Sequence, residues 1–309
     1  MPHSDAHPVP PTPWPPPVCP VDLKSFVKNL AALPSHGGAT AGQYRPTHVL
    51  IETRPQRIAT DPLPFVGFLD GIQTRCVAGR IQHRDVTLAY VAAGTVLDTT
   101  LLAVEERLAA LCSVQDEPRV RAALTGVPVV ALPELLPWNV ALATDEWIDS
   151  TRRVLEKEAL ANAPVAPGHY VVVDGSLPPV TDRTDAVGVV KDALSTVWLA
   201  DPGLLPTDAG WRSPALRIPA MKAGERPRLT AFVRLRDATG SHPWGFSLIR
   251  VETFEECGVE VLDAAAALAF SQRQPLGSGD PRAEIQLAGM YRTEQVLKAR
   301  SPIALDILR

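Results

Sequence analysis

The chain has 309 residues, of which 46% are hydrophobic and 21% are charged, and this apolar fraction excludes an intrinsically disordered protein. A formal net charge of −4 argues against a protein that coats nucleic acid over its whole surface, although a local basic channel would not show in that total. The 4 cysteines are too far apart in the sequence for a zinc knuckle or a redox pair, so we expect a globular protein with reduced thiols.

The first 64 residues are expected to lie outside the main domain. Residues 1–20 include nine prolines, which remove backbone donors and predict a disordered tail or, alternatively, a ligand for an aromatic groove on a partner. No run resembles a signal peptide and no apolar stretch reaches the ~18 residues that span a bilayer, so a cytoplasmic protein is expected. Residues 21–64 are expected to form a connection with a short helix, Asp22–Leu33, and one strand, Thr47–Thr53.

Residues 65–309 predict one domain that begins with an antiparallel meander. Apolar runs bounded by turn residues predict three strands with short connections, the first of which stops at Asp70-Gly71. Thr99 or Thr100 is expected to cap a helix that runs to Cys112, because the leucines after it lie near helical spacing. The strands are expected at Phe65–Leu69, Arg75–Gln82 and Val86–Val96, and a further short strand at Val127–Leu132 follows the helix.

The second half of the domain alternates helices and strands. A helix is expected to open at Thr144 or Asp145 and to end before Pro164. The β-branched run Tyr170–Val173 predicts a central strand that stops at an Asp-Gly pair, and Ala186–Lys191 is interpreted as its hairpin partner. Two later strands and a helix rich in small residues are expected at Arg228–Arg236, Phe246–Glu252 and Val259–Ser271. This order predicts a mixed α/β sheet with helices packed on it.

Two aspartates occupy the same local frame, because Asp70 and Asp174 each follow an apolar strand and precede a glycine. Taken singly, an Asp-Gly pair after a strand is most often a hairpin turn. Together they gain weight, since strands at the centre of a sheet can present such acids side by side, where ligands of open α/β sheets bind. Two converging carboxylates repel each other unless a cation neutralises them, and oxygen ligands select hard divalent ions. Convergence of the two aspartates would therefore imply a metal site.

Three segments resemble the motif series of the NurA nuclease family: Phe68–Gln73, the helix piece Arg153–Leu160, and Val172–Leu177 followed by Val189-Val190-Lys191. The resemblance covers roughly residues 65–300, and the C-terminal piece from Asp280 to Leu297 looks like the bacterial branch of the family. It implies an RNase H-like fold and a metal-dependent DNA exonuclease that favours Mn²⁺ over Mg²⁺. It also implies a homodimer that works with a HerA-type hexameric translocase on DNA ends, in repair or in defence.

The resemblance also implies roles for individual residues. Asp70, Glu156 and Asp174 would be the metal ligands, and Lys191 would support them near the scissile phosphate. Two divalent ions about 3.5–4 Å apart can activate a water and relieve charge on the leaving oxygen, which is what phosphodiester hydrolysis requires. A solvated lysine at a strand end is the alternative reading of Lys191.

Two positions of the implied site stay open. Archaeal members of the family end the site with a histidine, and His242, the last histidine of this chain, does not fit that place. Glu252 and Asp263 are then the candidates for a fourth site residue. On the helix, Glu156 and Glu158 are two residues apart, about 200° around the axis, so only one can face the metals. The resemblance favours Glu156.

A basic segment, residues 212–236, is the candidate for contact with DNA. It holds seven basic residues and one acid, which gives a formal charge of +6 in an acidic protein. A solvated basic loop is the alternative. The residues expected to bind DNA are Arg212, Arg217, Lys222, Arg226 and Arg228.

Two rival functions compete with a nuclease. A phosphotransferase of the actin-like or sugar-kinase type also places magnesium nucleotide on strand-end aspartates, but it needs glycine-rich phosphate loops, and no G-x-G-x-x-G or P-loop frame is present. A catalytically inactive adaptor of a DNA translocase would keep the fold without cutting, and the presence of all three acids argues against it. The sequence therefore favours a metal-dependent deoxyribonuclease.

Overall fold

The computed structural model describes residues 49–133, 139–191, 202–239, 242, 245–274 and 283–302. The proline-rich tail and the expected helix at residues 22–33 lie outside these ranges. Of the expected strand at residues 47–53, the two-residue strand β1 (Val49–Leu50) is present. In the part of the chain that is described, no helix is long and apolar enough to cross a membrane.

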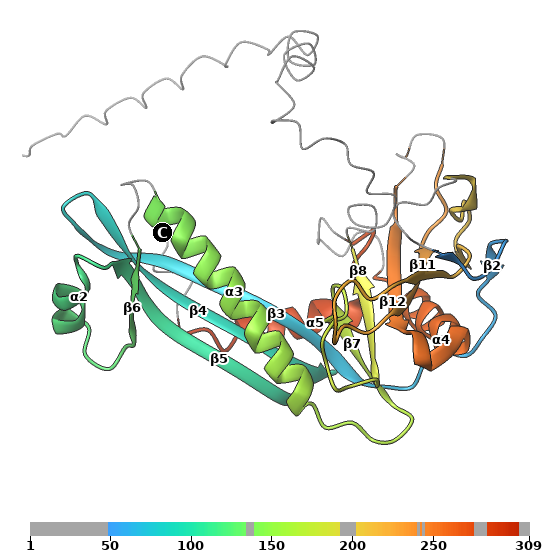
Figure 1. The fold of residues 1–309 in the computed structure, drawn as a ribbon, viewed down its shortest axis with the longest axis horizontal. Coiled ribbons are helices and arrows are strands. Elements are labelled where there is room, and N and C mark those ends of the chain that lie inside the picture. Colours follow the sequence, from blue (N-terminus) through green and yellow to red (C-terminus); the bar gives the residue numbers. More distant parts are fainter. Residues whose placement is uncertain are drawn as a thin grey trace, which may run out of the picture. The chain divides into compact units, whose positions relative to one another are not determined.

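One large mixed sheet organises the molecule, and in the described ranges it has 12 strands (Figure 1). Its central part contains β3 (Phe65–Ile81), β4 (Arg84–Leu97), β5 (Thr100–Ser113), β7 (Tyr170–Asp174) and β8 (Ala186–Val190). They lie side by side in the order β5-β4-β3-β7-β8. The first three strands are antiparallel, whereas β7 runs parallel to β3 and β8 runs parallel to β7. This order and these directions are those of an RNase H-like sheet, so the expected mixed α/β fold is confirmed.

Further strands extend the sheet on both sides. Beyond β8 lie the antiparallel strands β12 (Leu248–Phe254), β11 (Arg228–Arg234), β10 (Leu216–Ile218) and β1. At the other end β6 (Val129–Leu132) pairs in parallel with β5. The short strands β2 (Gln56–Arg57) and β9 (Trp211–Arg212) pair with each other beside β11.

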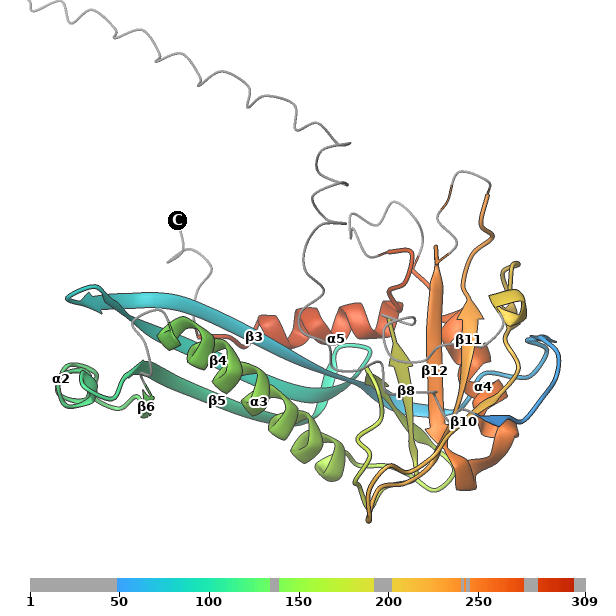
Figure 2. The same cartoon turned by 45° about the horizontal axis from the view of Figure 1, so that its top comes forward.

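Helices cover both faces of the sheet, as Figures 1 and 2 show. The long helix α3 (Asn139–Asn162) packs Leu155 and Ala159 onto one face, against residues of β3, β4 and β7. The opposite face is covered by α4 (Gly258–Ser271) and α5 (Ala288–Lys298). The remaining helical segments are α2 (Glu117–Ala123), η1 (Pro202–Leu204) and η2 (Glu255–Cys257).

An antiparallel meander of three strands is present, but its strands are not the three that the sequence predicted. β3 continues through Asp70-Gly71 to Ile81, so no turn lies there and the two strands expected at 65–69 and 75–82 are one strand. The expected helix at 99–112 is instead the strand β5, entered by a tight turn at Asp98, whose φ is +55°. β4 is almost wholly buried, and its backbone needs a hydrogen-bonded partner on both edges, which outweighs the helical spacing of the leucines.

Two more differences concern the elements after α3. β8 is parallel to β7 rather than its hairpin partner, because the connection from Gly175 to Asp185 crosses back to the start of β7 before β8 begins. α5 was not expected as a helix, because its sheet-facing positions include Gly289 and Thr293 rather than a full apolar stripe. Gly289 is required there, since a Cβ atom would lie 2.0 Å from the ring of Phe68.

Candidate functional site

The site begins where β7 ends beside β3. Leu69 of β3 pairs with Val173 of β7, and Asp70 and Asp174 are the next residues on these two parallel strands. β7 stops at Asp174 while β3 continues, so beyond this point that edge of β3 has no partner strand among the described residues. Sheet pairing therefore places the two aspartates next to each other at an opening in the sheet.

The strand alternation places both aspartates on the same face. Phe68 and Val172, two residues before each aspartate, belong to the core under α5, whereas Leu69 and Val173 belong to the core under α3. Because side chains alternate along a strand, Asp70 and Asp174 both point to the α5 side. The convergence expected from the sequence is thus present in the structure.

The electrostatics of Asp70 reflect this convergence. Burial and the neighbouring carboxylate of Asp174 raise the pKa of Asp70 to about 8, and Glu294 contributes in the same direction. The charge of Lys191 and a hydrogen bond of 2.7 Å donated by the Gly71 amide oppose the rise in pKa. A carboxyl group in this state needs a cation beside it before it can be charged at neutral pH.

Lys191 supplies a cation in this structure. It follows β8, on the same face as Val187 and Val189, and its Nζ donates to Oδ2 of Asp174 at 2.5 Å. Both side chains are about one sixth exposed, 16% for Lys191 and 17% for Asp174, so the pair is reachable from solvent. The structure therefore pairs Lys191 with Asp174, so the carboxylate of Asp174 already has a positive group beside it.

Glu156 approaches from the other face of the sheet. It lies on α3 directly over Gly71, where a Cβ atom would be 2.3 Å from its Oε1, and it pairs with Arg152 at 2.6 Å. Burial raises the pKa of Glu156, Arg152 lowers it, and the charge of Asp174 raises it further. The alternative residue Glu158 faces Arg107 of β5 at 3.6 Å instead. Of the two glutamates, Glu156 is the one that lies over Gly71 and whose pKa the charge of Asp174 affects.

A further acid that the sequence analysis missed is Glu294 of α5. Its charge acts on Asp70, and its carboxylate accepts a hydrogen bond of 2.6 Å from Lys298, one helical turn later. The sequence signal for Glu294 is an acidic residue near the C-terminus, where archaeal members of the NurA family have the histidine of the site. The earlier candidates lie elsewhere: Glu252 is buried behind the turn after β7, and Asp263 is bound to an arginine of β9.

The donor set fits a hard divalent cation, because the converging groups are carboxylates, and burial together with the charge of Asp174 raises the pKa of Asp70. Asp70 and Asp174 would hold such an ion on the α5 face. Among the described residues, no group of three or more His, Cys, Asp or Glu side chains is close enough to hold a metal as it stands. Glu156 and Glu294 flank the pair from opposite faces.

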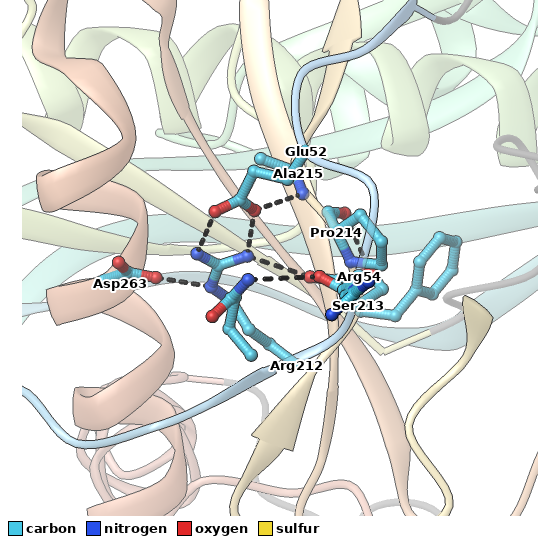
Figure 3. A network of polar contacts seen from close by, with 9 residues as sticks. Glu52, Arg54, Arg212, Ser213, Pro214, Ala215 and Asp263 are labelled. Carbon is cyan, nitrogen blue, oxygen red and sulfur yellow. Dashed lines mark hydrogen bonds and ion pairs between the residues drawn. The ribbon is translucent and has the colours of Figure 1, made fainter.

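Four of the seven basic residues in the segment form ion pairs with acids from other parts of the chain. Arg212 is 1% exposed, and its guanidinium lies between Glu52, at 2.5 Å, and Asp263 of α4 (Figure 3). The structure places Arg212 in the interior, so we leave it out of the proposed DNA contacts. Three other arginines form ion pairs as well: Arg217 with Glu255, Arg226 with Glu256, and Arg228 with Glu252. Lys222 is exposed.

Comparisons with known proteins add a structural likeness. No family model matches the sequence, and no curated protein matches it. Among solved structures, the chain is similar to the NurA nuclease from Sulfolobus solfataricus, with 13% sequence identity and a TM-score of 0.41, over 90% of this chain and 93% of that chain. The expected resemblance to NurA thus recurs at the level of structure, but the expected bacterial branch is not confirmed. At this identity and TM-score the likeness carries no argument about activity.

The fold and the site together define the class. The chain is an RNase H-like α/β protein in which Asp70, inside β3, and Asp174, at the end of β7, lie next to each other at an opening in the central sheet.

Proposed function

We propose that the protein is a metal-dependent deoxyribonuclease that hydrolyses phosphodiester bonds. The observation that carries this proposal is the pair Asp70 and Asp174 on neighbouring parallel strands, with the pKa of Asp70 raised to about 8. Carboxylates pressed together in this way bind a hard cation, and Mn²⁺ or Mg²⁺ is the ion that such oxygen donors take. Exonucleolytic action on DNA ends is the form of this activity that the sequence motifs favour.

The residues of the chain then take separate tasks. Asp70 and Asp174 would hold the ions, with Glu156 reaching the same opening from α3. Divalent ions bound there, two in number by the resemblance, would supply an activated water and charge relief on the leaving oxygen. Lys191 now binds Asp174, and a cation on that carboxylate would free its ammonium group to meet a non-bridging oxygen of the scissile phosphate. Lys222, Arg217 and Arg226 remain the proposed contacts to the DNA backbone, whereas Arg228 is held by Glu252 and by the Leu177 carbonyl.

The partners are part of the proposal. By the resemblance of its motifs, we infer a homodimer that acts with a HerA-type hexameric ATPase, in repair or in defence against foreign DNA. Several arginines of the basic segment are paired with acids, so we expect the nuclease alone to bind the DNA backbone weakly. A ring-shaped motor that encircles the DNA would keep the substrate close to the nuclease.

Incubation of the purified protein with end-labelled single- and double-stranded DNA tests the activity. We expect cleavage with Mn²⁺, at least as fast as with Mg²⁺, and none in excess EDTA. Asp70→Asn and Asp174→Asn should each lose cleavage while remaining folded, because each removes a charged ligand with almost no change in volume. Full activity in EDTA, or cleavage within about threefold of the parent in either variant, contradicts the proposal.

A further inference from the structure

A buried ion network lies behind the turn that follows β7. Its centre is Glu252 of β12, whose side chain is 1% exposed. One carboxylate oxygen, Oε2, accepts a hydrogen bond from the Leu177 amide at 3.1 Å and from Arg228 Nη1 at 3.0 Å. The other, Oε1, accepts from Arg250 and from the Ser176 hydroxyl, the latter at 3.5 Å. Arg250 also donates to the Ser176 hydroxyl at 3.3 Å.

The turn that this network holds has an unusual backbone. Gly175 has a φ of +115°, which L side chains rarely adopt, and its amide donates to the Val189 carbonyl at 2.8 Å. The Gly175 carbonyl lies against β8, where a Cβ atom on Gly188 would be 2.7 Å from it. The next two residues, Ser176 and Leu177, form hydrogen bonds with the Glu252 network.

A buried carboxylate with two guanidinium groups is weak evidence for stability, because desolvation of the charges offsets their attraction. The network does provide a charge-assisted hydrogen bond from the Leu177 amide, three residues after Asp174, to the Glu252 carboxylate, and this bond fixes the turn. Asp174 is the last residue of β7, so the backbone that follows its carboxylate is held by the bridge from Gly175 to Val189 and by the Glu252 network.

We propose that Glu252 is a positioning residue that, by holding the turn Gly175–Leu177, fixes the Asp174 carboxylate for cation binding. This inference rests on the proposed metal-dependent function. Glu252 touches neither the cation nor the substrate and acts through the turn alone. Groups of this kind behind a metal ligand typically change metal affinity about 10- to 100-fold when they are altered.

The test is Glu252→Asp, which keeps the charge that the two arginines need but withdraws the carboxylate by one methylene from the Leu177 amide. Mn²⁺ binding is measured directly from the free Mn²⁺ signal in electron paramagnetic resonance, and cleavage is measured over a range of Mn²⁺ concentrations. We expect the Mn²⁺ midpoint to rise about tenfold in both assays, while the rate at saturating Mn²⁺ stays within about threefold of the parent.

Two further variants make the outcome decisive. Asp116→Asn breaks another buried ion pair, with Arg84, near α2 at the far end of the sheet, and should lower stability without moving the Mn²⁺ midpoint. Ser176→Ala removes a smaller part of the network and should raise the midpoint about threefold, which keeps the test open if Glu252→Asp does not fold.

The possible outcomes separate the positioning role from the function on which it rests. An unchanged midpoint in folded Glu252→Asp, or in Ser176→Ala, overturns the positioning role, as does a loss of maximal rate alone. If the parent binds Mn²⁺ without cutting DNA, the proposed function fails and the binding midpoints still decide the role of Glu252. If the parent binds no Mn²⁺, both are overturned.

Discussion

At the scale of single residues, the raised pKa of Asp70 lowers the stability of the metal-free fold at neutral pH. Its pKa rises from 3.8 to about 8 on folding, because of burial and the charge of Asp174. Below about pH 4 the carboxyl is protonated in both the folded and the unfolded chain, so it has no differential effect. Between pH 4 and pH 8 the unfolded chain releases the proton and the folded chain keeps it, so stability falls as the pH rises.

Asp70→Asn should therefore stabilise the metal-free protein while abolishing cleavage. The expected gain in unfolding free energy at pH 7 is on the order of 2–5 kcal/mol, because the neutral amide loses no proton on unfolding. Urea denaturation in EDTA at several pH values measures it. The gain should shrink toward zero near pH 4, and a variant that is less stable than the parent at pH 7 contradicts the charged environment assigned to Asp70.

Glu294 is the second residue whose role can be tested directly. Its charge acts on Asp70 from α5, so Glu294→Gln should lower the pKa of Asp70 and, if Glu294 shares the cation, reduce cleavage at limiting Mn²⁺ by roughly tenfold or more. Lys298→Ala removes the ion-pair partner of Glu294 and serves as the control, with activity expected near that of the parent. Equal activities of the two variants over the whole Mn²⁺ range would exclude Glu294 from the site.

At the scale of elements, the contact between α3 and β3 decides which helix glutamate reaches the opening. Gly71 leaves room for Glu156, since a Cβ atom there would be 2.3 Å from Oε1 of Glu156 and 2.9 Å from Cγ of Arg152. An added methyl group must push both side chains away from the sheet. The place of the Glu156 side chain over β3 thus depends on a glycine that the sequence predicted to be part of a turn.

Gly71→Ala should reduce cleavage by about tenfold or more, because Glu156 is displaced while β3 itself tolerates alanine. Gly79→Ala is a matched control on the same strand, where a Cβ atom meets nothing within 4 Å, and it should leave cleavage unchanged. Kinetic assays of both variants at saturating Mn²⁺ give the comparison. Equal cleavage rates of Gly71→Ala and Gly79→Ala would show that cleavage does not require Glu156 to lie over Gly71.

The two helix glutamates give a separate test. Glu156→Gln should lose cleavage, whereas Glu158→Gln should keep it, because Glu158 faces Arg107 of β5 in an exposed ion pair of 3.6 Å. Both substitutions keep the shape of the side chain, so circular dichroism should show the same helix content. The opposite pair of activities would reverse the assignment of these residues on α3.

At the scale of the whole molecule, we expect a homodimer that binds a ring-shaped ATPase. Light scattering at micromolar concentration should give a mass near twice that of the 33.2 kDa chain. Deletion of residues 1–20 should leave both the mass ratio and the cleavage rate unchanged, because proline-rich segments seldom contribute to a packed core. A monomer in solution argues against the dimer, and loss of activity in the folded truncated protein would assign a role to the tail.

The basic segment shows what a count of charges along the chain can miss. Residues 212–236 carry a formal +6, yet Arg212 pairs with Glu52 and Asp263, and Arg217 pairs with Glu255. The neutralising acids come from other elements, one of them 160 residues away in the sequence. Net charge over a window is therefore no measure of the charge that the folded surface presents there.

The sequence alone determined the features that depend on neighbouring residues. Apolar runs with β-branched residues predicted β7, β11 and the first part of β3. Asp70 and Asp174 could be found in the same way, because each directly follows such a run in the sequence. Only the tertiary structure decided which strands pair, in which direction they run, and which side chains from distant segments lie close together. It made residues 100–113 a strand because β4 needed a partner, set β8 parallel to β7, and brought Glu294 to Asp70 from 224 residues away. Such contacts depend on backbone hydrogen bonds and burial shared between distant segments, which no local pattern of residues encodes.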